Sequence, residues 1–263
     1  MPKSLGAKHA KVQRLRALLR DSNARTAESV VVLEGTRAVL DALERRVELQ
    51  SVFVSVDGAV PSGLPPDCAV ERLAPGLIER VATTKTPQPI VAVAPRPEVV
   101  APHEFAEGGC LLVLAGVSDP GNVGTLVRAA EASGAVGVLV GPGTADVFSP
   151  KVVRASAGSI FGVPIATVDD LPAALTVVAA TGRRRLGTVA RGGRSYTGVG
   201  VLGGSVALVL GNEAHGLSQE IGSSIDEMLT IPMTGAAESL NVAMAGSVLL
   251  FEARRQRDAT RRP

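Results

Sequence analysis

The first part of the chain alternates short helical and extended apolar patterns. Val12, Leu15, Leu18 and Leu19 recur at helical spacing and predict a helix over residues 8–20. Beyond them, the pattern predicts a strand at 29–33, a helix after the turn at Glu34 and Gly35, a strand in "LQSVFVSV", a helix at 75–81 and a strand in "IVAVAP". These elements predict a small α/β domain.

A different pattern begins at residue 110, where continuous apolar runs alternate with helical patterns. Such runs indicate strands buried on both faces of a sheet, so the predicted fold class is α/β with a parallel sheet. The Pro-rich segment "PRPEVVAPHEF" predicts a boundary between a first domain at 1–100 and a second at 109–263. The strand candidates of the second domain lie at 110–117, 136–141, 163–168, 186–190, 206–211 and 229–233.

Capping residues mark where two helices of the second domain begin. Asp119 as N-cap and Pro120 at the first helical position open one helix, which Gly134 closes. Ser149 and Pro150 open another in the same way.

Composition narrows the ways in which the protein can bind a partner. Hydrophobic residues make up 46% and charged residues 20%, which is typical of a globular chain, and aromatic residues make up only 2%. Nucleic-acid binding would therefore rest on Arg, Lys and backbone groups rather than on aromatic stacking. The net charge is +2, but basic residues gather at 3–20, 183–194 and 254–262. These segments suit a polyanion, although each alone also fits a solvated helix face or a loose terminus.

Cysteine usage and hydropathy exclude several classes. Cys68 and Cys110 lie far apart without metal-ligand spacing, so we expect buried thiols in a reducing compartment, no disulfide and no metal site. No run of 18 apolar residues free of charge occurs, and the basic N-terminal segment lacks a following apolar region. The sequence therefore predicts a cytoplasmic protein without a membrane span.

Three polar clusters carry the candidate chemistry. The usual phosphate cradles are absent, because there is no Walker A motif and "GPGTAD" lacks the third glycine of a dinucleotide fingerprint. The absence of a G-x-S-x-G nucleophile elbow argues against an α/β-hydrolase. The clusters "SDPGNVGTLVRAAEASG", "LGNEAHGLS" and "IPMTGAAESLNVAMAGSVLLFE" lie at strand ends or helix starts, where α/β sheets bind ligands. The last opens a helix that is apolar nearly all round, so we expect it to be buried, with Ser239, taken alone, as its N-cap.

Together the three clusters resemble the signature motifs of the SpoU/TrmH family, the S-adenosylmethionine-dependent RNA ribose 2′-O-methyltransferases. The resemblance covers roughly residues 109–256, through "DPGNVGTLVRAAEASG", "LVLGNEAHGLS" and "IPMTGAAESLNVAMA". The first domain, with "VVLEGTRAVLDAL" and "TPQPIVAV", is similar to the L30e-like substrate-binding domain that many members carry. The family implies a C-terminal trefoil knot, which is a rare exception among folds, a homodimer, and an active site shared between subunits.

The resemblance also implies a pocket for S-adenosylmethionine. Gly211 is expected to let the backbone approach the cofactor, and main-chain groups at Ile231 and Leu240 are expected to hold its adenosyl part. The expected cofactor-binding residues are Thr188, Val189, Ala190, Leu210, Gly211, Asn212, Gly216, Ile231, Pro232, Met233, Ser239, Leu240 and Asn241.

The resemblance implies five catalytic residues, which are Asn122, Arg128, Glu213, Ser239 and Asn241. A neutral ribose hydroxyl is a weak nucleophile, so it needs orientation and some removal of its proton. Arg128 matches the residue proposed to take the proton or to hold the target phosphate, but a guanidinium is effectively always charged. We therefore expect Arg128 to stabilise phosphate and alkoxide, and Glu213 and Asn122 to hold the geometry. His215 is expected to serve the turn or the surface rather than to act as the base.

RNA contacts are expected at Arg37, Lys85, Arg128 and Arg154. An L30e-like domain favours ribosomal RNA, 23S in particular, because such a module suits a structured hairpin recognised by shape and backbone contacts. The same reaction on tRNA and a non-catalytic RNA-binding or ribosome-assembly factor are the alternatives. The Arg-over-Lys, Ala/Gly/Val-rich composition is typical of a GC-rich genome and leaves a role in antibiotic resistance open beside housekeeping modification.

Overall fold

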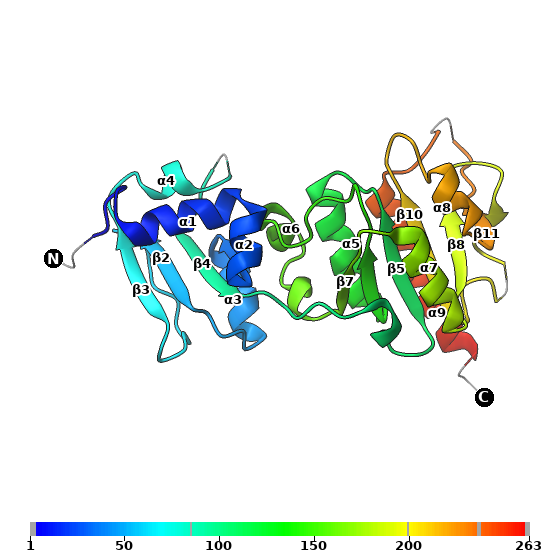
Figure 1. Ribbon diagram of the computed structural model, residues 1–263, viewed down its shortest axis with the longest axis horizontal. Coiled ribbons are helices and arrows are strands. Elements are labelled where there is room, and N and C mark those ends of the chain that lie inside the picture. Colours follow the sequence, from blue (N-terminus) through cyan, green and yellow to red (C-terminus); the bar gives the residue numbers. More distant parts are fainter. Residues whose placement is uncertain (1–3, 85, 199, 236–237, 261–263) are drawn as a thin grey trace. The chain divides into compact units, whose positions relative to one another are not determined.

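The structure is a computed structural model that describes residues 4–84, 86–198, 200–235 and 238–260. Contacts divide the chain into two compact units, both coloured along the sequence in Figure 1. The first unit comprises Met1–Pro97 and Asp146–Phe161, and the second comprises Glu98–Ala145 and Gly162–Pro263.

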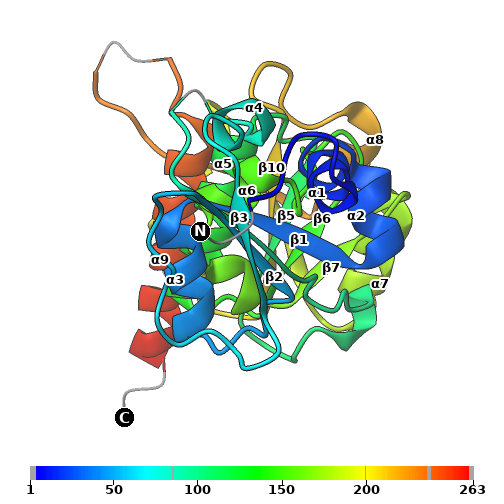
Figure 2. The ribbon, with the colours of Figure 1, turned by 90° about the vertical axis from the view of Figure 1, so that its left-hand side faces the viewer.

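The first unit is a four-stranded sheet with helices on both faces. Its elements are α1 (Ala10–Arg20), α2 (Ser22–Glu28), β1 (Val30–Glu34), α3 (Thr36–Glu44), β2 (Ser51–Ser55), β3 (Ala69–Leu73), α4 (Ile78–Val81), β4 (Ile90–Pro95), α6 (Pro150–Ala155) and η2 (Ser159–Phe161). The strand order is β1-β4-β2-β3, with β4 antiparallel to both neighbours and β3 parallel to β2. Figure 2 shows α1 and α2 on one side of this sheet and α3 on the other. The apolar stripe of α1, predicted from its spacing, lies in the core on the first of these sides.

A segment from the middle of the sequence completes the first unit. Residues 146–161 carry α6, which packs on β1. Arg25 donates to Asp146 at 2.5 Å, and Arg154 donates to Glu34 at 3.0 Å. These ion pairs join residues 121 and 120 positions apart, so contacts between distant residues, rather than local sequence, hold the segment here.

The second unit contains a seven-stranded sheet whose described pairings are all parallel. Its elements are η1 (Pro102–Glu104), β5 (Cys110–Ala115), α5 (Pro120–Ser133), β6 (Gly137–Val140), β7 (Ile165–Thr167), α7 (Leu171–Ala180), β8 (Arg184–Thr188), β9 (Arg194–Ser195), β10 (Val206–Gly211), α8 (Gln219–Ser223), β11 (Glu227–Thr230) and α9 (Val242–Thr260). The strand order is β7-β6-β5-β10-β8-β11-β9. Helix α7 packs in a core on one face of the sheet, and α5 and α9 pack together and contact its central strands. The predicted α/β class is confirmed, whereas the two-residue strand β9 is not among the predicted strands.

Capping chemistry explains where α5 begins and ends. The side chain of Asp119 accepts a hydrogen bond from the amide of Asn122 at 2.9 Å. Gly134 ends the helix in the left-handed region, with φ of 69°, which a glycine adopts without a Cβ penalty. Both ends lie where the sequence predicts them.

Two predictions for α9, its N-cap residue and its burial, are wrong. Asn241 rather than Ser239 caps the helix, since its Oδ1 accepts from the amides of Ala243 at 2.9 Å and Met244 at 3.3 Å. The helix is also not buried all round, because Met244, Val248 and Phe251 are 60%, 40% and 47% exposed. One apolar stripe of α9 therefore has no cover within the described chain.

Several arginines of the predicted basic segments serve the fold. Arg254 and Arg257 donate to carbonyl groups at the C-terminal end of α5, where the helix dipole favours a cation. Arg185 pairs with Asp226 at 2.6 Å. The ion pair of Arg185 offsets part of the positive charge of its segment, and the contacts of Arg254 and Arg257 hold these side chains against α5.

Candidate active site

The three polar clusters meet at the carboxyl edge of the parallel sheet. β5 and β10 are neighbours in register, and the chain continues from β5 to one side of the sheet through β6 and β7. The strand order thus reverses between β5 and β10, which is where α/β sheets bind ligands. The segment 116–122, after β5, therefore lies beside the turn 212–216, after β10.

The carboxylate of Glu213 joins these two strand ends. It accepts hydrogen bonds from the amide and hydroxyl of Ser118, both at 3.1 Å, from the amide of Asp119 at 3.3 Å and from Nδ2 of Asn122 at 2.9 Å. Burial raises the pKa of Glu213, but the hydrogen bonds, led by that of Asn122, outweigh it and lower the pKa to about 2. A carboxylate that accepts four hydrogen bonds and whose pKa is about 2 is poorly suited to take a proton at neutral pH.

A chain of amides continues from Glu213 to α9. Because a carboxylate only accepts, Asn122 must present its NH₂ group to Glu213, and its Oδ1 then accepts from Nδ2 of Asn241 at 3.0 Å. The Oδ1 of Asn241 is in turn fixed by the first amides of α9. The orientation of each side chain in this network is therefore determined by its neighbours.

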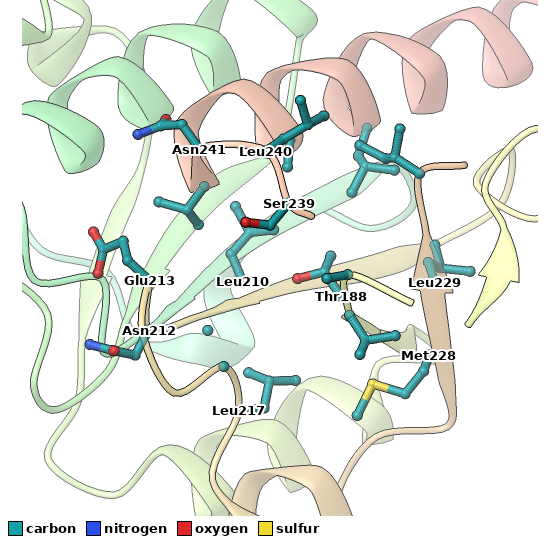
Figure 3. Close-up of a pocket in the computed structure, with 18 of the residues that line it drawn as sticks. Thr188, Leu210, Asn212, Glu213, Leu217, Met228, Leu229, Ser239, Leu240 and Asn241 are labelled. Atoms are coloured by element: carbon teal, nitrogen blue, oxygen red, sulfur yellow. The ribbon is translucent and has the colours of Figure 1, made fainter. Parts of the chain in front are cut away.

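A pocket of about 650 Å³ lies beside the network. Figure 3 shows Asn212, Glu213 and Leu217 on one side, Thr188, Met228 and Leu229 on the other, and Ser239, Leu240 and Asn241 along a third segment. All the predicted cofactor-binding residues except Pro232 line this pocket. Glu213, predicted as a catalytic residue, also lines the pocket. The lining residues that were not predicted for the site are Ala214, His215, Leu217, Met228, Leu229, Val242, Ala245 and Leu249.

The lining fits a largely uncharged ligand group such as adenosyl. Glu213 and His215 are the ionisable side chains in the described lining, and apolar side chains and backbone groups form most of the rest. Apolar walls with a few placed backbone donors and acceptors are typical of cofactor sites. In the described part of the chain, no group of three or more His, Cys, Asp or Glu is arranged to hold a metal ion. Nor is any described helix long and apolar enough to cross a membrane.

Gly211 is required by the backbone next to the pocket. A Cβ at this position would lie 2.4 Å from the carbonyl carbon of Gly216 and 2.7 Å from the amide nitrogen of Leu217. Asn212 and Gly216 exchange two backbone hydrogen bonds of 2.9 Å, which fold the turn back onto the end of β10. The close approach at Gly211 is thus to the chain's own turn, which forms part of the pocket wall.

The predicted catalytic residues do not all come together. Asn122, Glu213 and Asn241 form the network, and Ser239 lines the pocket. Arg128 is exposed on α5 and does not line the pocket, and its side chain makes no hydrogen bond or ion pair to any residue that the structure describes. Of the other predicted RNA contacts, Arg37 and Arg154 lie in the first unit, and Lys85 lies outside the described residues.

Replacing Glu213 by Gln is expected to weaken the fold in a pH-dependent way. The pKa of Glu213 is lower in the folded chain than in the unfolded one, so the carboxylate stabilises the fold above about pH 4.5, and this stabilisation is lost as the pH falls toward about 2. Urea unfolding from pH 7 to pH 3 should therefore show a gap between wild type and Glu213→Gln that narrows below pH 4.5. Glu220→Gln, at an exposed position on α8, is the control, and a gap independent of pH would contradict the role of Glu213.

Two family matches cover most of the chain. Residues 109–251 match the SpoU rRNA Methylase family, and residues 9–92 match the MRM3-like substrate binding domain. Among relatives, the chain is 34% identical to the 23S rRNA (guanosine(2553)-2′-O)-methyltransferase RlmP of Bacillus subtilis, over 88% of this chain and 90% of that one. It is 31% identical to the 23S rRNA (uridine(2479)-2′-O)-methyltransferase of Streptomyces viridochromogenes, over 95% and 91%.

Solved structures match in two different ways. The SpoU methyltransferase AviRb of Streptomyces viridochromogenes, in complex with the cofactor AdoMet, is 28% identical with a TM-score of 0.84, and the match covers 96% of this chain and 99% of that one. A structure described as giving insights into the 2-OH methylation of C/U34 on tRNA is 30% identical with a TM-score of 0.51. That match covers 98% of the other chain but only 57% of this one.

The fold and the site thus define a methyltransferase with a separate substrate-binding domain. The chain belongs to the SpoU rRNA methylase family. This confirms the predicted family, the predicted activity of an RNA 2′-O-methyltransferase, and S-adenosylmethionine as the cofactor.

Proposed function

We propose that the chain methylates the 2′-hydroxyl of a ribose in 23S ribosomal RNA. The observation that carries this proposal is the extent of the matches. The two rRNA-modifying relatives correspond to this chain over nearly its whole length, whereas the tRNA-related structure covers only 57% of it. The full-length matches therefore include the first unit, and a separate domain suits a structured RNA read by shape.

S-adenosylmethionine supplies an electrophilic methyl group when it is bound. The residues that line the pocket would hold this cofactor and position its methyl group. Ser239 and Asn241 line the pocket, and Asn122 accepts a hydrogen bond from Asn241, so that their hydroxyl and amide groups orient the ribose hydroxyl. Glu213 fixes these amides, and Arg128 stabilises the developing charge on the oxygen and the adjacent phosphate.

The enzyme acts as a homodimer in this proposal. The exposed apolar stripe of α9, formed by Met244, Val248 and Phe251, is the surface that the partner covers. Arg128 lies on α5, which packs against α9, so the same interface brings Arg128 to the pocket of the partner subunit. The family's trefoil knot belongs to the same arrangement and involves the segment leading into α9, which lines the pocket together with the turn 212–217.

Val248→Glu is expected to convert the dimer into monomers. A carboxylate on the stripe would have to be buried without a partner, which costs far more than an exposed charge. Val177→Glu on α7 is the matched control, because both valines are 40% exposed. Sedimentation velocity at equal concentrations separates the outcomes: the control stays dimeric, and a dimeric Val248→Glu variant would contradict the proposed interface.

The substrate proposal is tested by mapping 2′-O-methylation. Purified protein, S-adenosylmethionine and either unmodified ribosomal RNA or tRNA are incubated, and primer extension at low nucleotide concentration locates new stops. Stops in 23S RNA alone support the proposal. Stops in tRNA alone favour a tRNA methyltransferase. If no stops appear although the protein still binds RNA, a non-catalytic assembly factor is favoured. Growth of cells with and without the gene on ribosome-targeting drugs tests the proposed role in resistance.

A further inference from the structure

A second pocket, of about 350 Å³, lies in the first unit. We call it the α3 pocket, because it forms where β1 ends and α3 begins, beside the segment 82–90 and α6. Its volume is at the lower end of the range of about 300–1,000 Å³ for small-ligand sites, so it suits a single nucleotide rather than a duplex. Charged and polar residues of its lining include Glu34, Arg37, Asp41, Thr84, Gln88 and Arg154.

The first turn of α3 offers backbone donors to the α3 pocket. Gly35 is the N-cap and provides no side-chain cap, and the amide of Thr36 donates to Oε1 of Gln88 at 2.7 Å. The next amides, those of Arg37 and Ala38, have no acceptor within the helix, as in the first turn of any helix. These amides and the helix dipole favour an anion at this position.

Two arginines beside the α3 pocket are each held by a buried carboxylate. Nε of Arg37 donates to Asp41 at 2.7 Å, and a terminal nitrogen of Arg154 donates to Glu34 at 3.0 Å. The arginine side chains are 77% and 36% exposed, whereas those of Asp41 and Glu34 are 6% and 4% exposed. A guanidinium has five N–H donors, so each arginine is fixed in place and keeps donors for a ligand.

One carboxylate oxygen of Asp41 has no hydrogen-bond donor among the described residues. Its Oδ2 is buried and accepts no hydrogen bond from the residues that the structure describes. A buried acceptor in this state costs free energy, which an N–H group of a ligand would recover. Ala38, Ile90 and Ala157 supply apolar wall, and the guanidinium planes offer a surface on which a base can stack.

We propose that the α3 pocket binds one unpaired nucleotide of the RNA substrate. Its phosphate contacts Arg37, Arg154 and the first-turn amides of α3, and an exocyclic amino group of its base donates to Asp41. Adenine, guanine and cytosine carry such a group, and uracil does not. This inference rests on the proposed function for the identity of the RNA. According to this inference, the first unit recognises a nucleotide other than the one whose ribose is methylated.

Binding of short labelled oligoribonucleotides to the full chain tests this proposal. Oligo(C) is expected to bind roughly tenfold more tightly than oligo(U), because the proposed contact to Asp41 uses an exocyclic amino group, which cytosine carries and uracil lacks. Arg37→Ala should weaken oligo(C) binding by about tenfold and reduce the slope of log affinity against log salt by about one, as the loss of one phosphate contact requires. Arg37→Lys should retain the slope and part of the affinity. Arg80→Ala, at another exposed arginine of the first unit, should match wild type.

Activity measurements separate this inference from the proposed function. Arg37→Ala should raise KM for RNA by about tenfold and leave kcat and the thermal shift by S-adenosylmethionine unchanged. Equal binding of oligo(C) and oligo(U), or an Arg37→Ala variant that behaves like Arg80→Ala, would overturn the inference even if 23S RNA is methylated. Conversely, if the discrimination is observed but no ribosomal RNA is methylated, the proposed function fails and the pocket assignment stands. If the melting temperature of Arg37→Ala is well below that of the wild type, the same measurements are made on Arg37→Lys instead.

Discussion

Replacement of Arg128 by Ala is expected to lower methyl transfer by roughly 1,000-fold or more while the cofactor still binds. Removing a preorganised donor to a developing oxyanion has effects of about 10²–10³, and here a full positive charge is lost as well. The guanidinium is exposed and has no partner among the described residues, so its removal leaves no buried group unsatisfied. The fold and the cofactor pocket should therefore remain intact.

Transfer of labelled methyl groups to ribosomal RNA measures the rate, and thermal shift with S-adenosylmethionine measures binding. Thr125→Ala, at another exposed position of α5, is the control and should retain full activity. Arg128→Lys should recover only part of the rate, because an ammonium group keeps the charge but cannot form the paired contacts of a guanidinium. Full activity of Arg128→Ala would remove Arg128 from the mechanism.

Local chemistry made some elements predictable from sequence. The cap at Asp119 and the left-handed glycine at Gly134 act on their own helix, so a short stretch of sequence contains the relevant information. The start of α9 was harder, because Ser239 and Asn241 both precede an apolar run and only the three-dimensional path decides which side chain reaches the first turn. Likewise, the apolar pattern of α9 does not distinguish a side packed in the core from one left for a partner.

The candidate site shows the same division. Glu213, Asn122 and Asn241 stand in polar clusters at predicted strand and helix ends, and the structure brings them into one network. Pocket-lining residues such as Met228 and Leu249 carry no such signal, because an apolar side chain in a pocket wall has the same pattern as one in the core. The packing of residues 146–161 on the first unit depends on ion pairs between distant residues, for which no local rule exists.

Gly211→Ala is expected to abolish binding of S-adenosylmethionine. The added Cβ would meet backbone atoms of Gly216 and Leu217 at 2.4 to 2.7 Å, and backbone cannot rotate away as a side chain can. The turn 212–216 must move, and with it one wall of the pocket and the position of Glu213. No thermal shift with the cofactor and no methyl transfer should be detected, whereas Gly222→Ala on α8, where a Cβ meets nothing within 4 Å, should be neutral.

Mixing these two inactive variants tests whether the active site is shared. If Arg128 serves the pocket of the partner subunit, a mixed dimer contains one complete site: the intact pocket of the Arg128→Ala chain with Arg128 of the Gly211→Ala chain. Random exchange of subunits makes about half of the dimers mixed, so an equimolar mixture should recover roughly a quarter of the wild-type rate. If Arg128 instead serves the pocket of its own chain, no dimer contains a complete site and the mixture stays inactive. Adding Val248→Glu to both variants should abolish the recovery, because restoration then requires an interface that can no longer form.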